Sequence, residues 1–355
     1  VGGVAMQKAL GINAAKFGLL LSGIGWSYLC GQLPSGGLLD RFGSKRVYGI
    51  SIVAFSVCAF LIGLAGFADN VGLAAKFDGL MDIDMDASGN LYVADMNNHR
   101  IRKITPSNDV GAGEATTFAG TGVAGHADGD AAAATFNMPN VVAVGSDGSI
   151  YVSQTGFVSL RKISSGKVTT IAGDGVAGFA NGNGLSAEFN NPASMVVDAA
   201  GNIYIADTGN NRIRKVTAAG VVTTLAGSGT AGKADGTGAA AQFNQPGGIA
   251  IDASGNLYVA EVLNHDVRKI TPEGVVSTYA GNGTPGFTNG TGSAARFNYP
   301  EGIAIDASGT LYVADAGNNA VRRITSGGVV TTLAGIGIAG IVDGDADSAE
   351  FKTPN

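Results

Sequence analysis

The chain has 355 residues, of which only 14% are charged and 57 are Gly, and its formal net charge is −6. Residues 1–64 hold five bases and one acid, whereas residues 65–355 hold 17 bases and 27 acids. An acidic array is a poor electrostatic partner for nucleic acid, so nucleic-acid binding is not expected. Cys30 and Cys58 are the two cysteines, so the array after residue 64 contains none and needs no disulfide.

Two long uncharged stretches lie near the start of the chain. Residues 17–39 and 47–68 contain no charged side chain, and each is long enough to cross the roughly 30 Å hydrocarbon core as a helix. We therefore expect an α-helical two-span membrane segment within residues 1–64, with helices at about 15–39 and 47–66. The loop at residues 40–46 carries three bases, which predicts that it faces the cytoplasm.

The same loop resembles the motif between the second and third helices of the major facilitator superfamily. The preceding sequence GWSYLCGQLPSGG is similar to the second helix of the organic-anion symporters in that superfamily. The resemblance covers residues 1 to about 62, which is two complete helices of an expected twelve, so transport by this chain alone is not expected. The positions that match the loop motif are Gly36, Asp40, Arg41, Gly43, Lys45 and Arg46.

Five copies of one sequence pattern fill residues 65–355. Within each copy, a Gly-Ile-Ala-Ile-Asp strand, an Ala-Ser-Gly-Asn turn, a Leu-Tyr-Val-Ala strand and two further strands are predicted. Four short antiparallel strands in about 54 residues, without a helical pattern, are typical of one propeller blade. The copies align on Tyr92, Tyr151, Tyr204, Tyr258 and Tyr312.

These copies resemble NHL repeats. The matching residues are the Tyr-Val-Ala-Asp run, the Asn-Arg-Ile-Arg-Lys run at Asn211–Lys215 and the leading Asn-x-Pro. NHL domains are usually six-bladed, so the expected fold is an all-β, NHL-type β-propeller with five complete repeats of a six-bladed ring. Residues 65–77 align with residues 177–189, which places the junction with the membrane segment near Gly63.

Some of the histidines and acids are candidate metal ligands. His99 and His265 share a repeat position and would lie on one rim, but their blades are not adjacent, and a turn role is favoured. His126 lies in a different loop. Alternating acids suit calcium, which makes Asp343, Asp345 and Asp347 a weak candidate site, with a solvated loop as the alternative. No other metal site and no cofactor are expected.

One basic position recurs in every repeat. An acid lies seven residues before it in four repeats, at Asp95, Asp207, Glu261 and Asp315, and Gln154 takes that place in the remaining one. Pairing between acid and base within a blade therefore explains the basic residues better than an RNA-binding ring does. The recurring bases, which with the five tyrosines are expected to be structural, are Arg102, Arg161, Arg214, Arg268 and Arg322.

The function expected from these patterns is that of a membrane-anchored, non-catalytic scaffold. Its propeller would lie on the extracytoplasmic side of the cytoplasmic membrane and bind a protein, peptide or glycan at a rim. The chain shows no nucleophile elbow, phosphate loop or Ser/His/Asp set, so no enzyme activity is expected. Two alternatives stay open: a fragment of an organic-anion transporter joined to the propeller, and a propeller lyase or hydrolase.

Overall fold

The computed structural model describes residues 69–71, 75–106 and 113–355. It divides the chain into a larger unit, residues 79–106 and 116–355, and a smaller unit, residues 1–78 and 107–115. The expected membrane helices, the loop motif at residues 36–46 and the junction near Gly63 lie outside the described residues. Among the residues that are described, no helix is long and apolar enough to cross a membrane.

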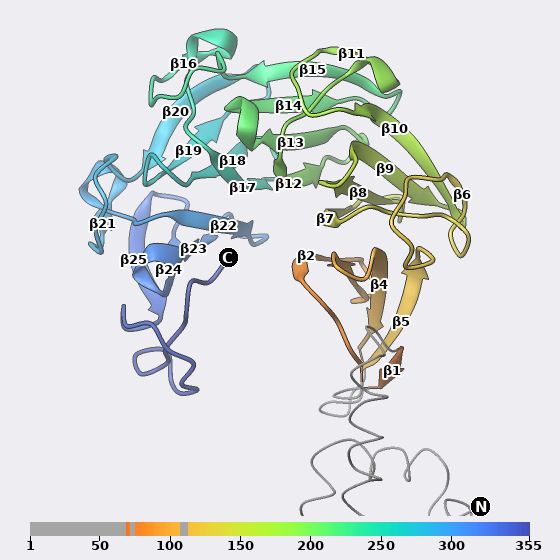
Figure 1. Ribbon diagram of the computed structural model, residues 1–355. Helices are drawn as coiled ribbons and strands as arrows, with labels where there is room; N and C mark the ends of the chain where they lie inside the picture. Colours follow the sequence, from red (N-terminus) through yellow and green to blue (C-terminus); the bar gives the residue numbers. More distant parts are fainter. Residues whose placement is uncertain (1–68, 72–74, 107–112) are drawn as a thin grey trace, which may run out of the picture. The chain divides into compact units, whose positions relative to one another are not determined.

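The larger unit is built from antiparallel sheets, one for each repeat, and each sheet is one blade (Figure 1). Blade 1 contains β2 (Leu80–Met85), β3 (Leu91–Asp95), β4 (Arg100–Thr105) and β5 (Glu114–Ala119). Blade 2 contains β6 (Gly129–Asp130), β7 (Pro139–Val144), β8 (Ile150–Gln154), β9 (Val158–Ser164) and β10 (Lys167–Gly175). Within the smaller unit, β1 (Asn70–Val71) pairs with Glu114 and Ala115.

The other three blades repeat this order. Blade 3 contains β11 (Gly182–Asn183), β12 (Pro192–Val197), β13 (Ile203–Asp207), β14 (Arg212–Val216) and β15 (Val221–Ala226). Blade 4 contains β16 (Gly236–Thr237), β17 (Pro246–Ile251), β18 (Leu257–Glu261), β19 (Asp266–Ile270) and β20 (Val275–Ala280). Blade 5 contains β21 (Gly290–Thr291), β22 (Pro300–Ile305), β23 (Leu311–Asp315), β24 (Ala320–Ile324) and β25 (Val329–Ala334).

Single 3₁₀ turns connect some of these strands. They are η2 (Gly184–Ser186), η3 (Thr208–Asn210), η4 (Gly238–Ala240), η5 (Gly292–Ala294) and η6 (Ala316–Asn318). The four strands that the sequence predicts for each repeat are confirmed. The sequence did not predict the two-residue outer strand that blades 2 to 5 add beside the fourth strand.

The turn between the first two strands of a blade shows why the pattern folds as it does. In blade 4, Asp252 Oδ1 accepts hydrogen bonds from the backbone N–H groups of Ser254 and Asn256 at 2.9 and 2.8 Å. Gly255 takes the left-handed conformation that this turn requires, with φ +81°. The hydroxyl of Tyr258 donates to Asp252 Oδ2 at 3.3 Å, and burial beside this acid raises the pKa of Tyr258 to about 12. The recurring tyrosine thus fixes the turn, and Tyr92, Tyr204 and Tyr312 make the same bond.

The hydrophobic core lies between successive blades. One cluster joins Tyr204 and Ile213 of blade 3 to Ile249 and Val259 of blade 4, and similar clusters join the other neighbouring pairs. A fully buried phenylalanine lies at each of these four junctions: Phe136, Phe189, Phe243 and Phe297. Blades 2, 3 and 4 bury apolar side chains on both faces against neighbours, so each of them depends on two other blades for its stability.

The innermost strands β2, β7, β12, β17 and β22 pack side by side in chain order (Figure 1). Two carboxylates join the first pair: Asp82 accepts from Val142 N at 3.0 Å, and Asp84 accepts from Val144 N at 2.7 Å. Further along, Gly248 lets the strands approach closely, since a Cβ there would lie 2.6 Å from the carbonyl oxygen of Glu301. Neighbouring blades are therefore held together by contacts between their innermost strands as well as by their apolar faces.

Five blades are formed, and the six-bladed ring expected from the sequence is not found in the described chain. Ile83 on β2 is 54% exposed, whereas Val142, at the same position of blade 2, is 2% exposed because it packs on blade 1. On the other side, residues 336–355 follow blade 5 without adding a sheet. They repeat only the connecting segment that precedes a blade, including its bridge between Ala339 and Phe351.

Candidate binding channel

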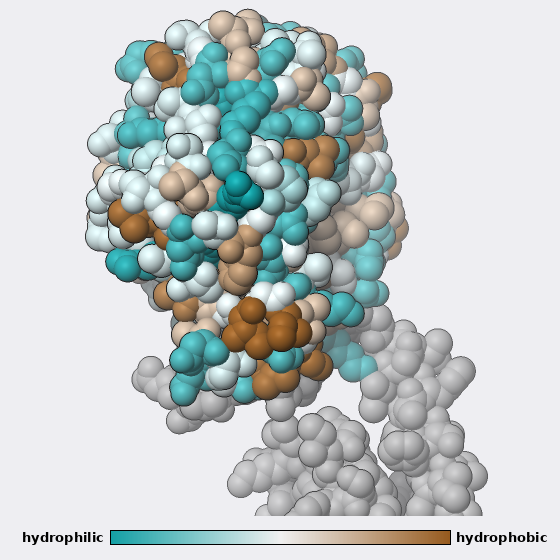
Figure 2. All heavy atoms as spheres, turned by 90° about the vertical axis from the view of Figure 1, so that its left-hand side faces the viewer, coloured by the Kyte–Doolittle hydropathy of each residue, from teal (hydrophilic) through white to brown (hydrophobic). Residues whose placement is uncertain are grey.

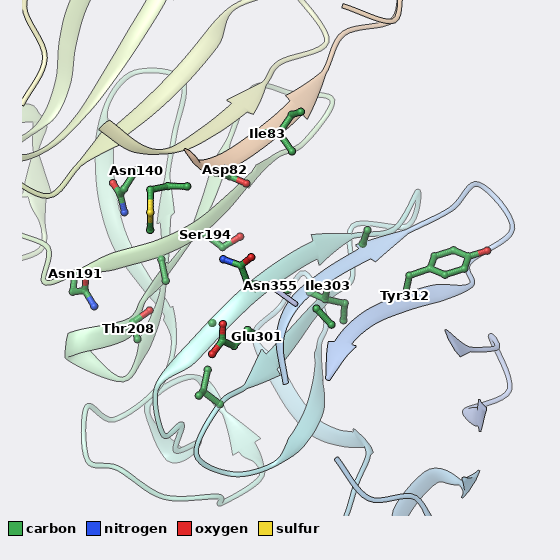
Figure 3. Close-up of a pocket in the computed structure, with 18 of the residues that line it drawn as sticks. Asp82, Ile83, Asn140, Asn191, Ser194, Thr208, Glu301, Ile303, Tyr312 and Asn355 are labelled. Atoms are coloured by element: carbon green, nitrogen blue, oxygen red, sulfur yellow. The ribbon is translucent and has the colours of Figure 1, made fainter. Parts of the chain in front are cut away.

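A cavity of about 620 Å³ opens along the innermost strands of the larger unit (Figure 3). Its lining comes from all five blades and from Asn355. Figure 3 shows Asn140, Asn191 and Thr208 on one side of this space and Glu301 on the other. Side chains far apart in the sequence therefore surround one volume, which is within the usual size range of a small-molecule or side-chain pocket.

Two positions of the repeat supply nine of the residues that line this cavity. The first lies at the second residue of the innermost strand, where the blades carry Met81, Asn140, Ala193, Gly247 and Glu301. The second directly follows the second strand, where Met96, Thr155, Thr208 and Val262 line the cavity. Ala316 holds the second position in blade 5 but is buried and does not line the space. The residue type differs in every blade at the first position, and at the second position only blades 2 and 3 share a residue type, which is Thr.

Several of the polar lining groups are bound within the protein. The Asn140 side chain donates from Nδ2 to the carbonyl oxygen of Pro192 at 2.7 Å and accepts from Ser153 Oγ at 2.8 Å. The Thr208 hydroxyl donates to the carbonyl oxygen of Pro246 at 2.6 Å. These bonds hold the neighbouring blades at a fixed spacing and leave the outer side of each group facing the cavity.

The charged side chains that line the cavity are Asp82 and Glu301. Burial raises the pKa of Asp82 to about 7, because removal from water penalises the carboxylate more than its backbone hydrogen bonds favour it. Burial also raises the pKa of Glu301. No signal in the sequence marked either acid, because each interrupts a strand pattern at a single blade.

The five recurring arginines lie away from this cavity, buried inside their blades. Arg102, Arg214, Arg268 and Arg322 each form an ion pair with the acid seven residues earlier, at 2.7 to 3.0 Å, and both side chains are fully buried. Blade 2 differs because Gln154 replaces that acid, and Arg161 pairs instead with Asp128, which is 45% exposed. Each of the five guanidinium groups is therefore paired with a carboxylate of the protein.

The arginines also carry backbone connections. Arg214 donates to the carbonyl oxygens of Glu188 at 2.9 Å and Ala180 at 2.7 Å, and to Asn181 Oδ1 at 2.9 Å. Its guanidinium lies over the ring of Phe189, with 5.2 Å to the ring centroid. One side chain thus ties the third strand of the blade to the segment that enters the blade.

His99 and His265 each form a hydrogen bond to the next blade. His99 Nδ1 accepts a hydrogen bond from Met138 N at 3.2 Å, and His265 Nδ1 accepts one from Tyr299 N at 3.1 Å. Asn211 and Asn319 hold the same position in other blades, and their side-chain oxygens accept the corresponding backbone bonds from Gln245 and Thr353. An acceptor at this position, rather than a metal ligand, is what these four junctions share.

The other metal candidates are not brought together. His126 stacks on the ring of Phe157, with the centroids 3.9 Å apart. Asp343, Asp345 and Asp347 are exposed in the segment after blade 5, where the carbonyl oxygen of Asp345 accepts from Ser348 N to close a turn. Within the part of the chain that is described, no group of three or more His, Cys, Asp or Glu side chains could hold a metal ion.

Family profiles match three parts of the sequence. The Major Facilitator Superfamily matches residues 2–76, the SMP-30/Gluconolactonase/LRE-like region matches residues 114–289, and the NHL repeat matches residues 297–324. The last match lies on β22 to β24, which are three of the strands of blade 5. The described blades form a β-propeller, and its fifth blade matches the NHL repeat. In the same sequence, the NHL propeller follows a segment similar to the Major Facilitator Superfamily.

Curated relatives divide in the same way. The probable galactarate/D-glucarate transporter of Pseudomonas putida is 46% identical over 66 residues, which are 19% of this chain and 14% of the transporter. NHL repeat-containing protein 2 of Homo sapiens is 32% identical in an alignment 278 residues long, which covers 65% of this chain and 37% of that protein. This chain therefore spans much less than two thirds of either relative.

A solved structure supports the fold of the NHL propeller. An auxiliary nutrient binding protein from Bacteroides ovatus ATCC 8483 superposes with a TM-score of 0.54 at 21% sequence identity. The match covers 71% of this chain and 59% of that one. At this level of identity, the likeness concerns the arrangement of the blades.

Proposed function

We propose that the NHL propeller is a binding module that takes a protein, peptide or glycan at the mouth of its channel. The supporting observation is that the repeat varies at the positions that line the channel and is constant at framework positions. The framework residues, namely the turn tyrosine and the buried arginine, recur in each blade. The two channel-lining positions instead carry Met, Asn, Ala, Gly, Glu, Thr and Val. A framework position in a ring of repeats usually keeps its residue type in each blade, whereas a residue that recognises a ligand is usually special to one or two blades.

Binding is proposed rather than catalysis because of the chemistry of the lining. The described cavity is lined by amides, hydroxyls, two carboxylates and apolar groups, without an imidazole or a thiol. A lyase or hydrolase would need a proton donor and an acceptor that converge on one bond. This second candidate keeps support from the SMP-30/Gluconolactonase/LRE-like match, and substrate turnover in the experiment below would favour it.

Filling the channel should abolish binding without unfolding the protein. Ala193 is exposed and lines the cavity, so Ala193→Trp is expected to weaken ligand binding at least tenfold on peptide and oligosaccharide arrays. Ala200→Trp, in the exposed turn between β12 and β13, is the matched control and should bind like the parent chain. Equal binding by both variants would place the ligand on another surface and refute the proposed channel function.

We also propose that this propeller is anchored in the cytoplasmic membrane with its blades on the extracytoplasmic side. The match of residues 2–76 to the Major Facilitator Superfamily supports membrane association, and the basic loop at residues 40–46 supports the orientation. The alternative is that the segment is a part of a transporter of organic anions. The matched segment covers 14% of the similar transporter.

A cysteine placed in the propeller tests this orientation. Thr230 is exposed in the loop between β15 and β16, so Thr230→Cys should react with a membrane-impermeant maleimide in intact cells. The endogenous Cys30 and Cys58 are first replaced by Ser, and this doubly substituted chain is the control. Labelling that appears only after lysis would place the propeller in the cytoplasm.

Finally, we propose that a sixth NHL blade closes the ring. Among the described residues, two apolar faces have no neighbouring blade: β2, where Ile83 and Met85 are exposed, and the segment after β25, where Ile341 is 90% exposed. Figure 2 shows apolar residues gathered low on the side of the propeller that carries blade 5. Exposed apolar surface of this kind marks an interaction site.

The shape of the junction favours a blade over another occupant. Thr353 N already donates to Asn319 Oδ1 at 3.0 Å, as the equivalent residues do at the start of blades 2, 4 and 5. The backbone of Asn355 lies against Gly302, since a Cβ on that glycine would be 2.9 Å from the Asn355 carbonyl carbon. Glu301 lies against Gly248 in the same way where β22 begins. The segment thus enters the position of a further innermost strand.

A further inference from the structure

The lining of the channel carries charge of one sign. Asp82 and Glu301 are its two charged residues, and Lys, Arg and His are absent among the described residues that line it. The buried arginines cannot compensate, because each is already paired inside its blade. A low-dielectric space with only carboxylates attracts cations and repels anions.

The acids and one amide at the channel still have bonding capacity. Neither the Glu301 carboxylate nor the Asn191 amide has a hydrogen-bond or ion-pair partner among the described residues, although both side chains line the cavity (Figure 3). Asp82 accepts only from backbone N–H groups. By contrast, Asn140 and Thr208 are bound within the protein. The available groups are therefore mainly acceptors, and a matching ligand must donate hydrogen bonds.

Burial makes an unpaired carboxylate costly at neutral pH, which is why the pKa of Glu301 is raised. A cation placed beside Glu301 would offset this cost and would be worth more here than at the open surface. The apolar part of the lining is also suited to such a ligand. Met81, Met96 and Val262 face the same space, and thioether side chains adapt to a flexible aliphatic chain.

We propose that the channel mouth binds an alkyl cation, which is an ammonium or guanidinium group carried on an aliphatic stem. Glu301 is the counter-ion, and Met81 and Met96 contact the stem. The cation can belong to a lysine or arginine side chain of a polypeptide or to a free amine. This assignment rests on the proposed channel function and specifies the chemistry of the ligand.

Calorimetric titration of the full chain in detergent tests the charge requirement. The probes are pentylamine, the neutral 1-pentanol of similar size, and N-acetyl-lysine methylamide. Both amines should bind at least tenfold more tightly than pentanol, and Glu301→Gln should weaken the amines at least tenfold while leaving pentanol unchanged. Glu273→Gln, which removes an exposed acid from the turn between β19 and β20, should change neither affinity. Tighter binding of the lysine derivative would indicate a polypeptide ligand, and tighter binding of pentylamine a free amine.

Two results would overturn the assignment. Equal affinity for pentylamine and pentanol, or amine binding that survives Glu301→Gln, would show that charge is not recognised. The Ala193→Trp variant separates this failure from failure of the channel itself. Binding of a neutral ligand that is lost in Ala193→Trp would keep the channel and discard the cation, whereas binding that persists in that variant would discard both.

Discussion

Arg214→Ala is expected to lower the free energy of unfolding by about 3–5 kcal/mol, which is the range for breaking a buried ion pair. The side chain is fully buried and forms a 2.7 Å ion pair with Asp207, which is itself fully buried. Its loss also removes donors to two backbone carbonyl oxygens and to Asn181. The Asp207 carboxylate would then be left buried with no compensating charge. Chemical denaturation followed by circular dichroism measures the change.

Blade 2 supplies a control of the same chemistry. Arg161 is equally buried, but its acidic partner Asp128 is 45% exposed and can be solvated when the arginine is removed. Arg161→Ala should therefore cost about 1–3 kcal/mol, less than Arg214→Ala. Lys215→Ala, on the opposite face of β14, removes a positive charge near the surface and should cost less than about 1 kcal/mol.

The pH dependence of Arg214→Ala gives a second readout. Burial already raises the pKa of Asp207 above its ordinary value, and removal of Arg214 should raise it further. A carboxyl group with a raised pKa in the folded state destabilises the fold increasingly as pH rises from the unfolded value toward the folded one. The difference between parent and variant should therefore be smaller at pH 5 than at pH 8.

The alternative role of the arginines makes a different prediction. If they formed a surface for RNA or another polyanion, Arg214→Ala would abolish polyanion binding and leave the melting curve unchanged. That pair of results would replace the binding-module proposal with a nucleic-acid function. The complete burial of all five guanidinium groups is the reason to expect the opposite.

The strands and framework residues were predictable because they repeat. Tyr258 and its turn, and Arg214 with its acid, recur at fixed spacing, so one copy of the pattern explains the others. The channel was not predictable by the same route. Glu301 and Asn140 occupy a position whose residue type differs in every blade, and only the arrangement of the blades around a common axis brings them to one cavity.

The outer strands and the hydrogen bonds of His265 and Asn319 to the next blade were not predicted, for a different reason. A two-residue strand such as Gly236–Thr237 is too short for alternation to reveal it, since it depends on pairing with Val275 and Val276. His265 and Asn319 differ in residue type but perform the same bond to the next blade. Both side chains place a hydrogen-bond acceptor at the same point of the blade. Because the residue types differ, the sequence pattern does not show that their role is the same.

Closing the ring should have the largest stabilising effect. Residues 248–301 comprise one 54-residue repeat in the same phase, and a second copy fused after Asn355 would supply a sixth blade. Burial of several side chains such as Ile83, Met85 and Ile341 is worth roughly 1.5–3 kcal/mol each. The midpoint of thermal unfolding should therefore rise by about 10 °C or more. A Gly/Ser extension of equal length controls for the added mass.

Ile83 reports whether the new blade occupies the expected place. In the parent chain Ile83 is more than half exposed, so Ile83→Ala should change stability by less than about 1 kcal/mol. In the extended chain the same substitution should cost about 2 kcal/mol or more, because Ile83 would then be buried as Val142 is between blades 1 and 2. If the extension left the midpoint unchanged and Ile83→Ala remained neutral, the exposed face of β2 would not be the docking face of a blade, and the five-bladed form would be complete.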